Sequence, residues 1–365
     1  MDFAFSEEQQ MLRDAVASWA RDRLPEGKVA ELATGEAGWD PASLPEMAEL
    51  GWTGLALPED AGGSAMGFLD ESVVIEELGR ALYPGPYWSS IALAAPALRG
   101  HGGYLARIAS GEAATLAWAE PDGPYLFADL GSAGTKAAQN GGGWTLTGVK
   151  DVVPDLGACA FAVVAARSSD GLGLWVVETA DAPVSVLATV DATRRLGRLV
   201  LDDTPAELVV APGEADAVLE RVRLRALAAL SVEAVGVASA AVEMARSYVS
   251  ERKQFEKAIG AYQAVAHQVA DSYMAVELAR SLAYWAAWCV DEEDAQAPVA
   301  VAAAKSASGE AAVFACERAI QVHGGIGFTW EHVLHRYYKR AQWIDSFEGP
   351  GPRHRETVAA RLLDG

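Results

Sequence analysis

The sequence contains little cysteine and an excess of acidic over basic residues. Its three cysteines, Cys159, Cys289 and Cys316, each lie in an apolar stretch far from the others. Such scattered thiols exclude a disulfide framework and provide no metal motif, so we expect reduced cysteines that pack in the core. The formal net charge of -21 argues against binding to nucleic acid, which requires a broad basic face.

Long uninterrupted apolar runs are also absent. No apolar segment reaches the length of a membrane span without a charge or a glycine. The acidic start MDFAFSEEQQ has no basic region followed by an apolar run, so no signal or transit peptide is visible. We therefore expect a cytoplasmic protein with no membrane partner. With 51% hydrophobic residues among 365, the chain can bury a sizeable core and form two or three domains.

The first third of the chain has the periodicity of α-helices. Ser6-Glu7-Glu8-Gln9 is a capping box that opens a segment with apolar residues at helical spacing. Further helices are expected over 45–50 and 69–82, and over 89–109 in two pieces, because a proline and glycines interrupt that pattern. A group of acidic residues is interpreted as a solvated helix face: Asp70, Glu71, Glu76 and Glu77.

From about Thr115 the pattern changes to short β-rich runs separated by glycine. Seven such runs, of which GRLVLDD and AELVVA are the last two, predict an antiparallel barrel or sandwich. Hairpin turns are expected at 140–143 and 169–171, where asparagine, aspartate and glycine favour tight turns.

Long helices return after residue 212. They are expected over 215–250, 263–291 and 298–322, and their alanine- and valine-rich faces suit a four-helix bundle that also packs against copies of itself. The predicted fold class is therefore α+β and multidomain. The expected domains are an N-terminal helical domain over 1–114, a middle β-barrel or sandwich domain over 115–212 and a C-terminal helical bundle over 213–365.

One carboxylate, Glu348, is placed like a proton acceptor. It stands on a glycine and proline turn, Phe347-Glu348-Gly349-Pro350, after a run of bases and aromatics. Trp343, Ile344 and Phe347 could desolvate the carboxyl group, which would make it a stronger base. The alternative interpretation is an ordinary glutamate on a surface turn.

Two further segments are candidate ligand contacts. Arg252-Lys253-Gln254-Phe255 gathers donors beside an aromatic ring, which suits a pyrophosphate and a planar ring, although cations at a helix end also interact with its dipole. Gly324-Gly325-Ile326-Gly327 follows a helix rather than a strand, which excludes a Rossmann fingerprint. These glycines either cap the helix or let the backbone approach a cofactor. His323 beside them is structural or contacts a ligand, and neither a metal motif nor a nucleophilic triad is recognisable.

Several separate motifs, in matching order and spacing, resemble the acyl-CoA dehydrogenase family over nearly the whole chain. They are GWTGLALPEDAGG with VVIEELGRAL, AWAEP, TLTGVK, AVGVASAAVEMARSYVSERKQFEKAIGAYQAV, QVHGGIGFTWEHVLHRYYKRA and FEGPGPRHR. The resemblance implies a flavoenzyme of fatty acid or lipid metabolism. Its reaction would remove the α and β hydrogens of an acyl-CoA thioester and give the trans-2-enoyl-CoA.

The resemblance also implies roles for individual residues. Glu348 would take the α proton while the N5 atom of FAD accepts the β hydride, and the Glu348 amide would donate to the developing enolate oxygen. Gly349 of the same turn would contact the substrate. The implied FAD contacts, made to the cofactor of a neighbouring subunit, are Arg252, Phe255 and Gln263, with Gln321, Gly324 and Gly325 along its adenosine half. A homotetramer or heterotetramer follows, with an electron-transfer flavoprotein as partner.

The chain departs from the family pattern at implied flavin contacts. Glu120–Tyr125 lacks the usual Gly-Ser-Asp continuation, and Val152 and Pro154 replace an aromatic and a hydroxyl residue. Pro350, after the Glu-Gly pair, has no N–H or hydroxyl to donate. These changes resemble the actinobacterial branch that acts on bulky acyl-CoAs, some of whose members are mixed tetramers. Two alternatives stay open, a subunit of a heteromeric acyl-CoA dehydrogenase with incomplete flavin sites and an acyl-CoA oxidase.

Overall fold

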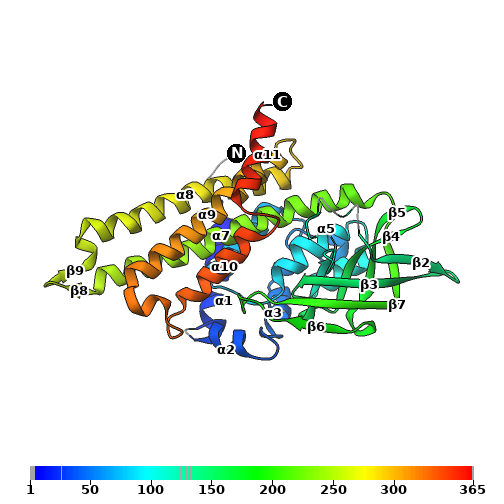
Figure 1. Cartoon of the computed structure of the whole chain (residues 1–365), viewed down its shortest axis with the longest axis horizontal. Helices are drawn as coiled ribbons and strands as arrows, with labels where there is room; N and C mark the ends of the chain where they lie inside the picture. The colour runs from blue at the N-terminus through cyan, green and yellow to red at the C-terminus, as the bar shows by residue number, and fades with distance from the viewer. Residues whose placement is uncertain (1–4, 26, 124, 128–129, 131–132, 364–365) are drawn as a thin grey trace. The chain divides into compact units, whose positions relative to one another are not determined.

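A computed structural model describes residues 5–25, 27–123, 125–127, 130 and 133–363 of the chain (Figure 1). These residues form two compact units. The first unit comprises Met1–Glu31, Phe68–Tyr83 and Leu227–Gly365, and the second comprises Leu32–Gly67 and Pro84–Ala226. The predicted division into three domains at residues 114 and 212 follows the local sequence pattern and stays a prediction.

The first unit is built from helices. They are α1 (Glu7–Arg23), α4 (Phe68–Arg80), most of α7 (Ala215–Glu251), α8 (Gln263–Asp291), α9 (Ala297–His323), α10 (Leu334–Ser346) and α11 (Gly351–Leu363). Between them lie the hairpin of β8 (Lys253–Gln254) and β9 (Lys257–Ala258) and the 3₁₀ turns η7 (Ile259–Ala261) and η8 (Gly324–Phe328). The bounds of α7, α8 and α9 agree with the prediction to within one residue. For α9, proline in the first turn and glycine at the end are the local signals.

The capping box predicted at the start of α1 is confirmed. Ser6 Oγ accepts a hydrogen bond from the Gln9 N–H at 3.1 Å, and Gln9 Oε1 accepts one from the Ser6 N–H at 3.1 Å. Both N–H groups would otherwise lack a partner within the helix.

Two helical segments, Ala215–Glu251 and Ala297–Phe328, are long and apolar enough to cross a membrane by length and composition alone. Their apolar windows are 83% and 67% buried inside the structure, respectively. A helix that is apolar all round and covered on most sides is typical of the core of a large protein.

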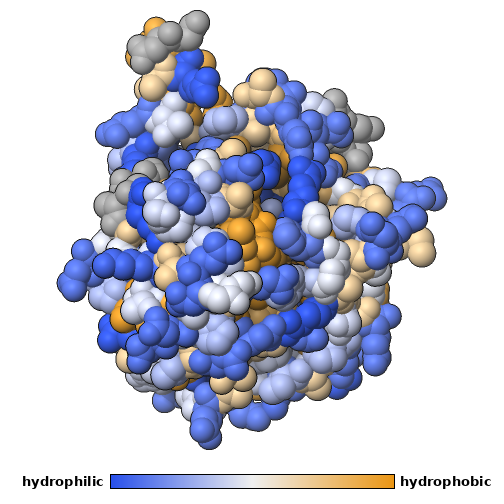
Figure 2. Space-filling model, turned by 90° about the vertical axis from the view of Figure 1, so that its right-hand side faces the viewer, coloured by the Kyte–Doolittle hydropathy of each residue, from blue (hydrophilic) through white to orange (hydrophobic). Residues whose placement is uncertain are grey.

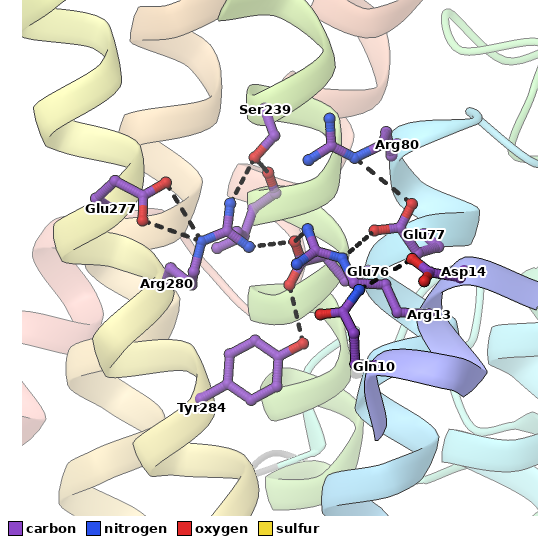
Figure 3. A network of polar contacts seen from close by, with 11 residues as sticks. Gln10, Arg13, Asp14, Glu76, Glu77, Arg80, Ser239, Glu277, Arg280 and Tyr284 are labelled. Atoms are coloured by element: carbon purple, nitrogen blue, oxygen red, sulfur yellow. Dashed lines mark hydrogen bonds and ion pairs between the residues drawn. The ribbon is translucent and has the colours of Figure 1, made fainter. Parts of the chain in front are cut away.

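The acidic residues of α4 do not form a solvated face, so that prediction is wrong. Three of them are 0%, 1% and 4% exposed, namely Glu71, Glu76 and Glu77. Arg13 of α1 donates to Glu77 at 2.9 Å, and Arg280 of α8 pairs with Glu76 (Figure 3). Tyr284 also donates to Glu76, at 2.9 Å. Buried carboxylates need such partners, and these lie on helices far from α4 in the sequence, where spacing within α4 cannot reveal them.

The second unit combines short helices with a barrel. Its helical elements are α3 (Ser43–Glu49), η1 (Trp52–Gly54), η2 (Glu59–Ala61), a π-helical turn (Ser89–Ala94), α5 (Ala95–Ala97) and α6 (Gly102–Ala109), and α2 (Lys28–Thr34) crosses the division between the units. Its strands are β1 (Ala114–Ala117), β2 (Lys136–Asn140), β3 (Gly143–Pro154), β4 (Phe161–Ser168), β5 (Gly171–Glu178), β6 (Val184–Leu187) and β7 (Leu196–Val210). The 3₁₀ turns η5 (Leu156–Ala158) and η6 (Thr179–Asp181) lie between strands.

The barrel is a closed ring of strands. It runs β4-β2-β3-β7-β5 and closes through the pairing of β5 with β4, while β1 adds to β4 and β6 adds to β7. Most pairs are antiparallel, as predicted, but β1 and β2 each pair parallel with β4. The runs GRLVLDD and AELVVA form the single strand β7, because Thr204 and Pro205 between them stay paired with β3.

Both predicted hairpin turns are confirmed. Asn140 pairs with Gly143, and the two glycines between them have φ angles of +58° and +101°, the left-handed conformations of a type I′ turn. Ser168 pairs with Gly171 across the second turn.

The cysteines lie in the interior, and hydrophilic residues dominate the face of the molecule drawn in Figure 2. The three cysteines are free and buried, which confirms their expected packing role. Hydrophilic residues cover most of the face in Figure 2, and hydrophobic residues gather in a hollow near its centre.

Candidate active site

Glu348 lies on the short connection between α10 and α11. Its φ angle is +58°, and it is only 9% exposed. A left-handed conformation costs a residue with a side chain about 1–3 kcal/mol and persists only where the surrounding structure holds it. The buried Glu348 is therefore not an ordinary glutamate of a surface turn, and its role as a base stays a prediction.

Hydrogen bonds hold the turn next to Glu348. The Gly349 N–H donates to the Ser346 carbonyl at 3.0 Å, and His354 Nε2 lies 3.1 Å from the Gly349 carbonyl oxygen. Gly349, the predicted substrate contact, therefore has both of its backbone polar groups engaged within the chain.

Pro350 stands at the start of α11. Its carbonyl accepts a hydrogen bond from the Arg353 N–H at 3.0 Å. A proline is well tolerated here, because the first N–H groups of a helix have no partner within the helix. This departure from the family pattern thus has a local structural reason.

The first group of predicted FAD contacts lies on the surface of the helical unit. Arg252, directly after α7, and Gln263, the first residue of α8, are both exposed. Phe255, at the tip of the β8–β9 hairpin, is 87% exposed and has a φ angle of +51°. The aromatic ring is therefore open to contact from outside the segment.

The second group lies at the C-terminal end of α9. Gln321 is exposed in its last turn, and Gly324 ends the helix with a φ angle of +65°. A Cβ atom added to Gly324 or Gly325 would meet nothing within 4 Å. Neither glycine is therefore required for packing within the chain, and both leave backbone open to an approaching ligand.

A stack of rings brings these two groups together. Tyr248, one turn before Arg252 on α7, stacks on His323 beside Gly324 with ring centroids 4.2 Å apart. His323 is 5% exposed, and its Nδ1 lies 2.7 Å from the Ala319 carbonyl oxygen. Burial lowers the pKa of His323 despite this contact, so the ring is neutral at pH 7. His323 is thus a structural link between the ends of α7 and α9.

Sequence reasoning missed a buried ion pair in the barrel. Lys150 is 0% exposed, and its Nζ donates to Glu120 at 2.7 Å. Glu120 also accepts from the Gly134 N–H at 2.6 Å and the Thr135 N–H at 2.9 Å. Burial alone would raise the pKa of Glu120, but Lys150 and these hydrogen bonds lower it to about 2. The motifs AWAEP and TLTGVK contain the two charges, but their spacing does not show that they meet.

Strand β3 is strained at Val152, one of the two positions where the chain lacks the flavin-covering residues of the family. Val152 has a φ angle of +48° at a shift in the pairing register, which is a genuine outlier for a β-branched residue. Pro154 ends the strand, and Asp155 follows with a φ angle of +54°. In the other departing segment, Glu120–Tyr125, Pro124 lies outside the described residues.

Two family models match this chain, one in its N-terminal part and one in its C-terminal part. Residues 6–112 match the family model described as acyl-CoA dehydrogenase, N-terminal domain, and residues 222–363 match the C-terminal domain. The acyl-CoA dehydrogenase IpdE2 of Mycobacterium tuberculosis is 34% identical over 336 residues, which are 92% of this chain and 91% of that protein.

Solved structures agree with this result. The Tcur3481-Tcur3483 steroid ACAD, in a variant form, is 32% identical with a TM-score of 0.86 and covers 98% of both chains. A chain of the ChsE4-ChsE5 complex of Mycobacterium tuberculosis is 26% identical with a TM-score of 0.88, and the match covers 100% of this chain and 100% of that chain. The chain is an oxidoreductase that belongs to the acyl-CoA dehydrogenase family.

Proposed function

We propose that this protein is an FAD-dependent acyl-CoA dehydrogenase that converts an acyl-CoA thioester to the trans-2-enoyl-CoA, with Glu348 as the base. The observation that carries the proposal is the burial of Glu348 on the strained turn between α10 and α11, at 9% exposure. Burial removes water from the carboxylate, which suits a group that must accept a proton from carbon.

The chain's own residues perform the proton transfer in this proposal. The α C–H bond breaks, its proton moves to the Glu348 carboxylate, and the electron pair shifts toward the thioester carbonyl. The Glu348 backbone N–H donates to the carbonyl oxygen as negative charge develops there. FAD, when bound, supplies the acceptor for the β hydride. The proposed electron acceptor is an electron-transfer flavoprotein.

The proposed FAD contacts fit an anionic dinucleotide with planar rings. A guanidinium and two amides are the donors, and the exposed aromatic ring can stack on a planar ring. The open backbone of Gly324 and Gly325 permits close approach. These residues face outward from the helical unit, which supports contact with the FAD of a second subunit and hence a tetramer, homomeric or heteromeric.

Replacing Arg252 by alanine is expected to weaken flavin binding about 10- to 100-fold, because a charge-assisted hydrogen bond contributes about 1.5–3 kcal/mol. The measurement is the ratio of flavin to protein absorbance after dialysis. Arg246→Ala is the matched control, since Arg246 lies earlier on α7 and pairs with Glu243 at the surface. Equal flavin retention in the two variants would remove Arg252 from the proposed site.

The proposed reaction is tested directly on the purified protein. Mixing it anaerobically with acyl-CoAs of different length and bulk is expected to bleach the flavin absorbance and to yield the enoyl-CoA that lacks two hydrogens, identified by mass spectrometry. The names of the relatives include a steroid ACAD, which supports bulky acyl groups as the first to try. Flavin-loaded protein that converts no acyl-CoA would contradict the proposal. Peroxide release without an added acceptor would select the oxidase alternative.

A second candidate is a subunit of a heteromeric acyl-CoA dehydrogenase with incomplete flavin sites. Two observations favour it: the similar structures Tcur3481-Tcur3483 and ChsE4-ChsE5 carry two-component names, and Val152, Pro154 and Pro350 depart at flavin contacts. This candidate predicts a colourless protein that gains flavin only when it is expressed together with its partner.

A further inference from the structure

Helix α9 contains a fully buried lysine that contacts α10 three residues before the candidate base. Lys305 is 0% exposed, and its Nζ donates to the Asp345 carbonyl at 3.0 Å. Asp345 lies in the last turn of α10, where carbonyl groups have no partner within the helix. The ammonium group of Lys305, on α9, therefore caps the C-terminal end of α10, three residues before Gly349.

Helix α9 also holds the far end of the Glu348 turn. One turn along from Lys305, a Cβ atom added to Gly309 would lie 2.5 Å from Asp345 Oδ1, so α9 and α10 pack closely at this point. On the α11 side, Arg355 donates to Ser306 Oγ at 3.0 Å and also pairs with Glu310. Residues 305–310 of α9 thus contact both helices that the turn connects.

The charges around Lys305 form one group with Glu348. Burial lowers the pKa of Lys305 to about 8, although the carboxylates of Asp345 and Glu348 both raise it. Burial raises the pKa of Asp345, which Lys305 counteracts. The charged or titratable groups that the contacts place close to the turn include Glu310, Arg353, His354 and Arg355. The charge of Lys305 therefore interacts with those of Asp345 and Glu348.

We propose that Lys305 is a positioning residue for the base: its ammonium group anchors the end of α10 and supplies the positive charge that favours an ionised Glu348. This inference rests on the proposed function, because it assigns the anchored carboxylate its task. In this proposal the contact of Lys305 with Asp345 sets the geometry of the turn. The charge of Lys305 favours the deprotonated form of Glu348.

The first test is the pH profile of kcat/KM for Lys305→Met, which keeps the length of the side chain and removes its charge. The midpoint of the acidic limb is expected to rise by about one pH unit, because an opposite charge nearby shifts a carboxyl group by about 1–3 units. Lys28→Met, which removes a half-buried lysine of α2 that pairs with Glu31, is the control and leaves the midpoint unchanged. Lys305→Gln keeps a donor for the Asp345 carbonyl, and it is read in the same way if Lys305→Met does not fold.

The second test needs no enzyme activity. Thermal midpoints are measured for Lys305→Met, Glu348→Gln and the double variant. Coupled charges predict that the double variant loses less than the sum of the two single losses. Additive losses together with an unmoved pH midpoint would overturn the proposal. Non-additive losses in a protein that converts no acyl-CoA would instead refute the proposed function while the link between Lys305 and Glu348 stands.

Discussion

Glu348→Gln is expected to lower kcat for acyl-CoA dehydrogenation by about 10²- to 10⁴-fold, the range for loss of a positioned general base. Glutamine has the same shape, so the turn with its φ angle of +58° can persist, but the amide cannot accept the α proton. The measurement is the rate of flavin bleaching after anaerobic mixing with the best acyl-CoA.

Glu356→Gln is the matched control for this experiment. Glu356 is an exposed glutamate of α11, and its replacement should leave both rate and flavin content unchanged. The Glu348→Gln protein should also retain its flavin, so that the loss is assigned to chemistry rather than to cofactor binding. Dehydrogenation at the wild-type rate would remove Glu348 from the role of base.

Glu120→Gln is expected to destabilise the barrel by about 3–5 kcal/mol, because it leaves the ammonium group of Lys150 buried without its counter-charge. Urea unfolding followed by the fluorescence of barrel tryptophans such as Trp175 measures this loss. Glu112→Gln serves as control, since Glu112 pairs with Arg107 near the surface and such pairs contribute about 1 kcal/mol or less. A loss no larger than that of the control would refute the importance of the buried pair.

The pH dependence of this effect has a definite sign. The pKa of Glu120 is lowered to about 2 from an ordinary value of 4.5, so its contribution is present above pH 4.5 and is lost as the pH falls toward 2. As the pH falls from 4.5 toward 2, the free energy of unfolding of the wild-type protein should therefore fall more steeply than that of Glu120→Gln. The difference between the two free energies should narrow.

Local signals in the sequence predicted the parts of the fold that depend on neighbouring residues. The capping box at Ser6, the bounds of α8 and the turn at Gly141 follow from hydrogen bonds and backbone preferences within a few positions. The burial of Glu76 depends instead on Arg280, which lies 204 positions away. Because the acidic pattern of α4 is the same whether its partner is water or arginine, the pattern alone could not distinguish the two.

The candidate site was predictable in the same uneven way. Family motifs indicated Glu348, but neither its left-handed backbone nor the contact of Lys305 with Asp345 leaves a periodic signal, since these residues are 40 positions apart. Lys305 is the single lysine of the alanine-rich helix α9, and no other charge lies within four residues of it. That isolation was the available signal, because a lone lysine on an apolar helix must find a partner when it is buried.

The closed ring of strands has a consequence for the behaviour of the protein in solution. An open sheet edge is a template on which another chain can pair, and closure removes such edges. Among the strands that the structure describes, β1 and β6 join the sheet beside the ring with four residues each, and the separate β8–β9 hairpin has two residues in each strand. Pairing of another chain with the strands of the ring would therefore require the ring to open first. Resistance to aggregation by this route depends on the stability of the barrel rather than on the acidity of the surface.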